Sequence, residues 1–473
     1  MIKTISIYGF RGFEKRQTIE FAIPSGENNG SGLSIIIGAN NSGKTTIIEA
    51  IKAFNHYNSD EVCFSEGRRN NASDGRVELS LTTADCDEYI IRTIETGGAA
   101  TTSNITVADF NSNKTLSYIV PSRRTVPVFF FKNVMDRKAY ISNSLHLEQL
   151  RSAELQDFNA RIFEINKNKE KFDPVINRIL GNEFEWLMDC SDTGQYYIKY
   201  YNNGNPHNGD GIGDGIWSVF TICAALFDSE PNSTIVIDEP ELSLHPSLQR
   251  RLMKLFLEYS KDRQIILSTH SPYFIDWETI VSGGALIKVS KEYGASCCYS
   301  IKDTNRKFIN GLIKDLHNIH TIGITAKEAL FTEDKLILTE GQEDVTIYSH
   351  ILKELGMELD GEFFGWGAGG ESKIEGFLQL FHQLGYKKIV AIYDGDKEKE
   401  ALLAQRKYPL YKICSIPTKD IRDKDERKIE SKIGIATRAG TLKEEYKGDT
   451  EKMFIDINSY FKSSLEQDVV RDV

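Results

Sequence analysis

Two adjacent carboxylates carry the clearest chemistry in this sequence. Asp238 and Glu239 follow the apolar run 234–237 directly, and a turn containing Pro240 and His245 comes next. At the end of a buried strand, the first acid can hold a divalent cation and the second can take a proton from an attacking water. The pair therefore predicts part of a nucleoside-triphosphate site, with Asp238 as a Mg²⁺ ligand and Glu239 as the catalytic base.

A phosphate loop stands far upstream of that pair. Residues 38–45 fit the pattern G-x-x-x-x-G-K-[ST] at every fixed position. Lys44 is expected to reach the β- and γ-phosphates of ATP, and the Thr45 hydroxyl to ligate Mg²⁺. The predicted nucleotide-binding residues of this loop are Gly38, Asn40, Asn41, Ser42, Gly43, Lys44, Thr45 and Thr46. An ordinary glycine-rich turn is the alternative interpretation, and the downstream acid pair disfavours it.

Two further segments extend the predicted ATP site. The run 264–272 predicts another buried strand, which ends in a hydroxyl pair and His270. This histidine is expected to sense or polarise the γ-phosphate. In 209–215, glycines alternate with other residues before a helix, which predicts a second anion-binding nest at Gly213 and Gly215. One nucleotide does not need two nests. The pattern therefore indicates a head-to-tail homo-oligomer, at least a dimer, in which the second nest closes over the partner's nucleotide.

The C-terminal third carries a separate set of carboxylates. Glu340 follows the apolar run 335–339. Asp394 comes directly after the apolar run 387–393, and Asp396 stands two residues further on. Carboxyl ends of parallel strands meet at one edge of a sheet, so these acids can converge. Because no histidine or cysteine stands beside them, they suit Mg²⁺ or Mn²⁺ rather than Zn²⁺. A solvated turn is the alternative interpretation of the paired aspartates alone.

Buried strands and amphipathic helices must position these groups. The apolar run 33–37 predicts a strand before the phosphate loop, and the spacing in 46–54 predicts a helix after it. Strands that alternate with helices indicate an α/β fold with parallel sheets. The expected domains are an ATPase head at 1–300 with a helical lobe at about 144–180, a linker at 301–332, a second α/β domain at 333–425 and a charged helical tail at 426–473.

The order of the N-terminal motifs resembles the ABC-type P-loop ATPase heads of the OLD (overcoming lysogenisation defect) family. The similarity extends from residue 1 to about 290 and includes the opening 5–13, in which Arg11 would lie near the nucleotide. One departure concerns the nest, where Asp214 is present and the usual serine beside glycine is missing. The resemblance implies a head that binds ATP and pairs with a second head.

The C-terminal third resembles a TOPRIM domain, the Rossmann-like metal-binding fold of topoisomerases, primases and OLD nucleases. In that pattern Glu340 is the invariant acid, and Asp394 and Asp396 are the paired acids. Asp344 matches an acid that OLD nucleases add for a second metal ion, and Glu343 competes for that role. Two metal ions would activate a water and stabilise the leaving oxygen of a phosphodiester.

The match to TOPRIM domains becomes thinner after Asp396. Lys432 is the counterpart of a lysine that assists the scissile phosphate in those enzymes, and the roles of Asp420 and Asp423 stay open. A charge run is more often a solvated face, which is the alternative interpretation of this segment.

Composition limits the classes of function. The net charge of −11 argues against a protein that simply coats nucleic acid, although basic pairs occur at 68–69, 123–124, 137–138 and 250–251. We expect DNA to enter a restricted channel, or a partner to supply basic surface. The seven cysteines include no C-x-x-C pair. No apolar stretch reaches the length of a membrane span. A reduced, cytoplasmic protein with no membrane partner is expected.

The leading hypothesis is an ATP-dependent or ATP-regulated DNA endonuclease that uses Mg²⁺ or Mn²⁺. The resemblance implies antiphage defence, alone or with a partner protein or a reverse-transcriptase element such as a retron and its nucleic acid. The alternative is an ATPase that clamps DNA or a partner, with a non-catalytic TOPRIM module. A primase or topoisomerase is disfavoured because no tyrosine-nucleophile domain or zinc module is found. The predicted catalytic residues are Glu239, His270, Glu340, Asp394, Asp396 and Lys432.

Overall fold

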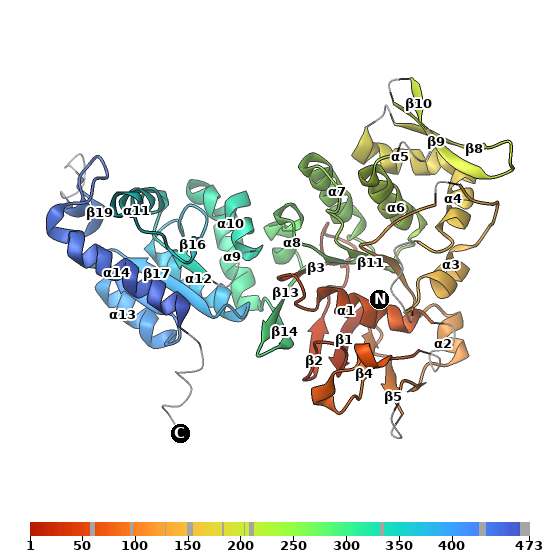
Figure 1. Ribbon diagram of the computed structural model, residues 1–473, viewed down its shortest axis with the longest axis horizontal. Coiled ribbons are helices and arrows are strands. Elements are labelled where there is room, and N and C mark those ends of the chain that lie inside the picture. The colour runs from red at the N-terminus through yellow and green to blue at the C-terminus, as the bar shows by residue number, and fades with distance from the viewer. Residues whose placement is uncertain are drawn as a thin grey trace. The chain divides into compact units, whose positions relative to one another are not determined.

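The protein folds into two compact units, Met1–Ser300 (unit one) and Ile301–Val473 (unit two). Figure 1 labels their helices and strands. Both units combine helices with parallel strands, which agrees with the α/β fold predicted from the sequence. The structure, a computed structural model, describes residues 1–56, 62–94, 98–127, 129–148, 155–181, 184–202, 204–207, 212–331, 335–424 and 432–463.

Unit one contains a six-stranded sheet that holds the predicted phosphate-loop strand. Its order is β14 (Ala295–Ser300), β13 (Ala285–Glu292), β3 (Leu33–Ile37), β12 (Gln264–Ser268), β11 (Thr234–Asp238) and β7 (Ser117–Val120). Figure 1 labels β14, β13, β3 and β11 of this sheet. All pairs run parallel except β13–β14. Strands β3, β11 and β12 are buried at every residue, as expected for apolar runs covered on both faces. Their carboxyl ends meet at one edge, where ligands bind in such sheets.

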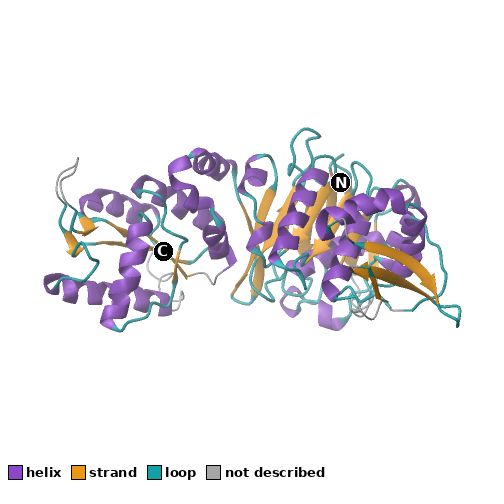
Figure 2. Cartoon of the chain, turned by 90° about the horizontal axis from the view of Figure 1, so that it is seen from above, coloured by secondary structure: helices purple, strands orange, loops and turns teal. Residues whose placement is uncertain are grey.

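Unit one also contains two antiparallel sheets. The larger has the order β2 (Gln17–Glu20), β1 (Ile2–Tyr8), β4 (Glu78–Thr83), β5 (Glu88–Thr93) and β6 (Thr101–Ser103). Gln264 connects it to β12, because its side-chain amide exchanges hydrogen bonds of 2.7 and 2.6 Å with the backbone of Ile2. The smaller sheet, which lies at the edge of the unit (Figure 2), joins β10 (Asn205–His207), β9 (Tyr196–Asn202) and β8 (Glu185–Cys190).

The helices of unit one are α1 (Lys44–Lys52), α2 (Val107–Asn111), α3 (Arg137–Ser144), α4 (Phe158–Lys167), α5 (Lys169–Leu180), α6 (Asp214–Asp228), α7 (Pro246–Tyr259) and α8 (Trp277–Val281). The lobe predicted at about 144–180 contains α4 and α5. Helix α5 contacts α6 and α7. The rings of Phe172 and Phe220 lie 5.1 Å apart in the α5–α6 contact, so the lobe packs on the helix that follows the predicted nest. Residues 149–154, inside the predicted lobe, lie outside the described residues.

Unit two is built on a four-stranded parallel sheet. Its order is β16 (Glu362–Phe363), β15 (Lys335–Leu338), β17 (Lys388–Tyr393) and β18 (Lys412–Ser415). Successive strands along the chain are connected by α11 (Gln342–Leu355), α12 (Glu371–Gln383) and α13 (Glu398–Lys407). This βαβ order is Rossmann-like, and it brings the ends of β15 and β17 side by side. None of the helices described in either unit is both long and apolar enough to cross a bilayer.

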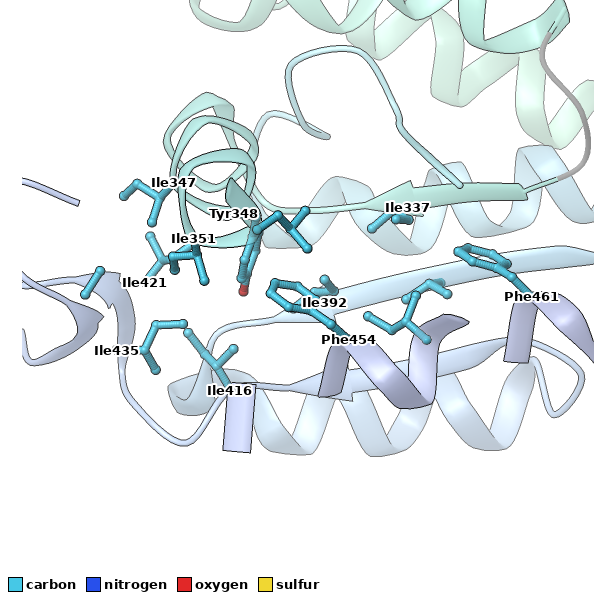
Figure 3. Packing of buried hydrophobic residues seen from close by; sticks show 14 residues of the cluster. Ile337, Ile347, Tyr348, Ile351, Ile392, Ile416, Ile421, Ile435, Phe454 and Phe461 are labelled. Carbon is cyan, nitrogen blue, oxygen red and sulfur yellow. The ribbon is translucent and has the colours of Figure 1, made fainter. Parts of the chain in front are cut away.

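The segment 426–473, predicted as a charged tail, contributes to the core of unit two. Its described residues, 432–463, form β20 (Gly434–Ala436), which pairs with β19 (Asp420–Arg422), and α14 (Glu444–Lys462). Figure 3 shows Phe454 and Phe461 of α14 packed in the hydrophobic core. The tail prediction misses this because charged side chains cover the outer face of α14, while the apolar ones recur on one face. Residues 425–431 and 464–473 lie outside the described residues.

The segment predicted as a linker is also folded into unit two. Helix α9 (Asp303–Lys314) packs against α12, with the rings of Phe308 and Phe377 5.2 Å apart. The Asn305 amide donates a 2.7 Å hydrogen bond to Gln383. A 3-10 segment, η7 (Leu316–Ile322), and α10 (Ile324–Glu328) continue the chain to β15. Residues 332–334 lie outside the described part of the chain.

Candidate functional site

The phosphate loop connects β3 to α1, as the sequence predicts. Gly38 has a φ of +150° and Gly43 a φ of +122°, and both values disfavour any side chain. A Cβ on Gly38 would also lie 2.1 Å from the Val289 carbonyl oxygen. The Lys44 ammonium donates 3.0 Å hydrogen bonds to the carbonyls of Gly38 and Ala39. Burial lowers the pKa of Lys44, and the nearby acids, first Glu239, oppose that change.

Thr45 and Asp238 meet where α1 faces the end of β11. The Thr45 hydroxyl donates to Asp238 Oδ2 at 3.3 Å, and Ser268 at the end of β12 donates to Asp238 Oδ1 at 2.5 Å. Asp238 is buried, and each of its carboxylate oxygens is fixed by a hydrogen bond from one of these hydroxyls. A hydroxyl and a carboxylate within hydrogen-bond distance form an oxygen donor set that suits Mg²⁺. The residues therefore fit the predicted cation, with Thr45 and Asp238 as its protein ligands.

Glu239 and His270 face each other across the same edge of the sheet. His270 Nε2 lies 3.8 Å from Glu239 Oε1. Burial, followed by the charge of Lys44, lowers the pKa of His270, so the ring is neutral at pH 7. Glu239 has a φ of +49°, an unusual conformation for a residue with a side chain. At this spacing, the carboxylate can accept a proton and the neutral imidazole can donate a hydrogen bond.

One cavity of about 330 Å³ brings most of the predicted nucleotide residues together. Gly38 and Ser42 belong to the loop but do not line this space. The lining residues are Arg11, Gly12, Asn40, Asn41, Gly43, Lys44, Thr45, Thr46, Glu239, His270, Lys291 and Ser296. Arg11 forms a 2.8 Å ion pair with Glu49 of α1, which compensates its charge.

Sequence reasoning missed the contribution of the β13–β14 hairpin to this cavity. Ser296 donates from its backbone N–H to the Gly12 carbonyl at 2.7 Å and from its hydroxyl to the Ser42 carbonyl at 2.6 Å. The Lys291 ammonium donates to the Gly294 carbonyl at 3.0 Å and lines the cavity. No local motif marks these residues, because they reach the phosphate loop through the pairing of β13 with β3.

Glu241 is a further missed residue. Its carboxylate accepts hydrogen bonds from the Thr269 hydroxyl at 2.8 Å and from the His270 backbone N–H at 2.5 Å. These bonds fix the backbone that carries the His270 ring. Burial raises the pKa of Glu241, and the hydrogen bonds from His270 and Thr269 oppose that change. The position of Glu241, as the second glutamate after Asp238, is the feature of the sequence that could have marked it as a site residue.

The predicted nest lies outside the phosphate-loop cavity. Gly213 caps the N-terminus of α6 with an ordinary φ of −65°. Gly215 is required for close packing, because a Cβ there would lie 2.5 Å from the Ser243 carbonyl oxygen. Asp214 instead lines a separate cavity of about 420 Å³. The preceding residues 209–211 lie outside the described part of the chain.

The acids of unit two line a third cavity, of about 540 Å³. Glu340 Oε1 accepts a 3.2 Å hydrogen bond from the Asp394 backbone N–H, which joins the ends of β15 and β17. Asp396 does not line the cavity, but its carboxylate lies 3.2 Å from the Lys432 ammonium. The lining residues are His317, His320, Glu340, Gly341, Gln342, Glu343, Asp344, Gly369, Gly370, Asp394, Asp420, Lys424 and Lys432.

The carboxylates of this cavity repel one another. Burial, followed by the charges of Glu340, Asp344 and Asp420, raises the pKa of Asp394 to about 8. Burial also raises the pKa of Asp344 to about 6, although its carboxylate accepts a 2.8 Å hydrogen bond from Gly341 N–H. A divalent cation would relieve this crowding, so the donor set fits Mg²⁺ or Mn²⁺. Among the described residues, however, no three His, Cys, Asp or Glu side chains already form a group that could hold a metal ion.

Three acids whose roles the sequence left open, Asp420, Asp423 and Glu343, have different ion-pair partners in the structure. Asp420 is buried and forms ion pairs with Lys424 at 2.8 Å and Lys432 at 3.8 Å. Asp423 pairs with Lys443 at 2.8 Å and does not line the cavity. Glu343, the competitor of Asp344, forms ion pairs with Arg422 and Lys424. Asp420 and Glu343 therefore line the cavity and Asp423 does not, a difference that the sequence did not reveal.

Two family descriptions match unit one. An "AAA domain" matches residues 4–190, and an "AAA domain, putative AbiEii toxin, Type IV TA system" matches residues 108–276. Together they include the phosphate loop, the acid pair and His270.

Three curated relatives match parts of the chain. The OLD nuclease of Thermus scotoductus is 29% identical over 261 residues, 53% of this chain and 48% of that protein. Endonuclease GajA of Bacillus cereus is 29% identical over 172 residues, 35% of this chain and 28% of that protein. These matches confirm the resemblance to the OLD family. Septu protein PtuA of Bacillus thuringiensis is 24% identical over 288 residues, 52% of this chain and 68% of that protein. The matched region spans about half of the OLD nuclease and less of GajA.

Solved structures with detectable similarity include two SMC heads. The SMC head bound to the C-winged-helix domain of ScpA aligns with 65% of this chain and 99% of its own, at a TM-score of 0.42 and 16% identity. The SMC head domain from Thermotoga maritima aligns with 64% of this chain and 99% of its own, at a TM-score of 0.37 and 18% identity.

Proposed function

We propose that the chain is an ATP-dependent DNA endonuclease, in which unit one hydrolyses ATP and unit two, as a TOPRIM domain, cleaves DNA. The observation that carries this proposal is the single cavity that unites Lys44, Glu239 and His270. The nuclease half is supported by the acids at the ends of β15 and β17, and by relatives named as nucleases.

In unit one, each residue has a distinct task. Lys44 and the N-terminus of α1 bind the β- and γ-phosphates, because both present positive charge to an anion. Thr45 and Asp238 hold Mg²⁺. Glu239 accepts a proton from the attacking water, and neutral His270 donates a hydrogen bond to the γ-phosphate.

In unit two, Glu340, Asp394, Asp396 and Asp344 would hold Mg²⁺ or Mn²⁺. Bound ions of this kind activate a water and stabilise the leaving oxygen of a phosphodiester. Lys432 binds the scissile phosphate, and its ion pair with Asp396 positions its ammonium at the rim of the acids. DNA is therefore the proposed substrate.

A second candidate function is an ATPase that clamps DNA or a partner, with a non-catalytic unit two. The ion pairs of Asp396 and Asp420 with Lys432 favour it, because they already balance part of the negative charge. The two functions predict different results with supercoiled plasmid, Mg²⁺ or Mn²⁺, and ATP. The endonuclease converts the plasmid to nicked or linear forms, and Asp394→Ala abolishes that conversion. The clamp retains plasmid in an ATP-dependent complex without breaking it. Both functions require ATP hydrolysis that Lys44→Ala abolishes. If the wild-type chain shows no such hydrolysis, alone or in complexes, both functions are wrong.

We also propose that unit one pairs with a second copy, and that the chain acts in antiphage defence. The nest at α6 lies outside the chain's own phosphate-loop cavity, which supports a role in a partner's site. Light scattering of Glu239→Gln with ATP should show a dimer or larger assembly, and a monomer under all nucleotide conditions would contradict it. Plaque counts on bacteria that express the chain, with and without a partner protein or reverse-transcriptase element, test the defence role.

A further inference from the structure

Arg124 is a buried arginine that the proposed mechanism has not used. It lies in the loop that follows β7, in the basic pair 123–124 that the sequence marks as a possible phosphate-binding surface. Arg123 is exposed, but Arg124 is only 8% exposed. Burial, opposed by the charges of the acids around it, lowers the pKa of Arg124 to about 10, so it keeps its charge at neutral pH. A buried charge of this kind needs several hydrogen-bond acceptors.

Those acceptors belong to two different elements. One Arg124 terminal nitrogen donates to the Ser218 hydroxyl of α6 at 2.5 Å. The other donates to the backbone carbonyl of Asp238 at 3.0 Å and to that of Glu239 at 2.5 Å. Its Nε donates to the Pro121 carbonyl at 2.7 Å, which fixes the side chain at its base. The guanidinium therefore joins α6 to the backbone of both acids.

The backbone of Glu239 depends on such contacts. Its φ of +49° lies in the left-handed region, which residues with side chains rarely adopt. The Glu239 N–H donates to Ser268 at 3.0 Å, and its carbonyl accepts from Arg124 and from Leu242 N–H at 3.3 Å. Because the Cα conformation sets the direction of the carboxylate, these bonds determine where the proposed base points.

A second contact ties the start of α6 to the turn that follows Glu239. Gly215 lies so close to Ser243 that a Cβ would reach its carbonyl oxygen at 2.5 Å. Arg124, Ser218 and Ser243 also line the cavity of about 420 Å³ at the start of α6. A change in the position of α6 therefore reaches the Glu239 turn through two separate contacts.

We propose that Arg124 is a positioning residue for ATP hydrolysis, which ties α6 to the Glu239 backbone so that the base points correctly only when α6 is seated. The inference rests on the proposed ATPase function of unit one. Arginine suits this role because its planar guanidinium reaches four acceptors at once, whereas lysine has a single ammonium. Arg124 does not line the nucleotide cavity and contacts only the backbone carbonyl of one lining residue, Glu239, so its substitution should lower kcat without changing ATP affinity.

The experiment compares Arg124→Ala with Arg92→Ala, an exposed arginine on β5 of the same unit. ATP turnover, binding of a fluorescent ATP analogue and thermal unfolding are measured for each. We expect Arg124→Ala to bind the analogue like the wild type and to lose at least about tenfold in kcat. Millimolar guanidinium should restore part of that rate by entering the adjoining cavity, whereas ammonium at equal ionic strength should not. Arg92→Ala should match the wild type.

Ser218→Ala provides a test that does not depend on the stability of Arg124→Ala. It removes the acceptor on α6 and leaves the two bonds to the acid carbonyls, so we expect a fall in kcat of about threefold or more with unchanged ATP affinity. Unchanged kcat in both variants overturns the inference. Weaker analogue binding that parallels the loss of rate, with no guanidinium rescue, also overturns it in favour of a purely structural role. A wild-type protein without ATPase activity would instead refute the proposed function itself, and the inference with it.

Discussion

The two acid-bearing sites differ in how completely the protein prepares them. In unit one, the Lys44 ammonium donates to the Gly38 and Ala39 carbonyls, and each Asp238 oxygen accepts a hydrogen bond from a hydroxyl. In unit two, Asp394 and Asp344 are buried close to other acids, and burial raises the pKa of both. The first site has an arrangement that a nucleotide can enter without rebuilding it. The second has excess negative charge that an added cation must balance.

This difference predicts which of the two sites depends more strongly on its ligand. A site with balanced charges tolerates the empty state, because each polar group already has a partner. In a site with crowded carboxylates, burial and mutual repulsion disfavour the charged forms until a cation binds. DNA cleavage should therefore respond more steeply to divalent cation concentration than ATP binding does.

The largest effect is expected from Asp394→Ala, which removes the acid with the most strongly raised pKa in the cavity of unit two. Plasmid cleavage should fall below detection, because a lost cation ligand commonly costs several kcal/mol of barrier. ATP turnover should stay within about twofold of the wild type, since Asp394 lies in the other unit. Asp423→Ala is the matched control, because that acid pairs with Lys443 outside the cavity. Cleavage that persists in Asp394→Ala would place the nuclease site elsewhere.

Glu239→Gln tests the base of unit one. The amide cannot accept a proton from water, so kcat for ATP should drop by about 10²–10⁴-fold while the protein still binds ATP. Glu258→Gln on α7, an exposed acid paired with Arg178, should behave like the wild type. Turnover of the Glu239→Gln protein at the wild-type rate would show that another group activates the water.

Phe454→Ala asks whether the C-terminal helix belongs to the fold of unit two. Phe454 is fully buried in the hydrophobic core, so truncation should destabilise unit two by about 3–5 kcal/mol. Ile455→Ala, at the next position, is the control, because that side chain is 55% exposed. Chemical denaturation followed by tyrosine fluorescence measures both, and equal effects would contradict the observed packing.

The smallest effect is expected from Lys291→Ala. Its ammonium lines the nucleotide cavity and donates to a neutral carbonyl, Gly294, so it can attract a phosphate. Loss of that attraction should weaken ATP binding by about fivefold, or about 1 kcal/mol. Titration calorimetry measures it, with Lys254→Ala on the exposed face of α7 as the control. Unchanged affinity would mean that the lysine only borders the cavity.

The sequence predicted those parts of the molecule that short local patterns specify. The strand at 33–37 begins and ends where the apolar run does, and the strand predicted in 264–272 begins at Gln264 but ends at Ser268. The helix after Gly341 begins at Gln342, as expected. Such runs are buried along their whole length, so tertiary context has little freedom to move their ends.

Residues that reach a site through long-range pairing could not be predicted. Ser296 meets the phosphate loop only because β13 pairs with β3. Arg124 looked like half of a surface pair, since nothing local shows that its guanidinium is covered by α6. Asp420 and Asp423 differ only in which lysines the fold places beside them.

The two hydrogen bonds from Lys44 to the loop's own carbonyls have a thermodynamic consequence. Before ATP arrives, the ammonium is held by Gly38 and Ala39, so folding has already ordered the loop and its cation. Binding then exchanges one set of partners for another instead of freezing a mobile segment. Calorimetry should therefore show a small entropic penalty and a modest heat capacity change, and association should be limited by encounter rather than by loop ordering.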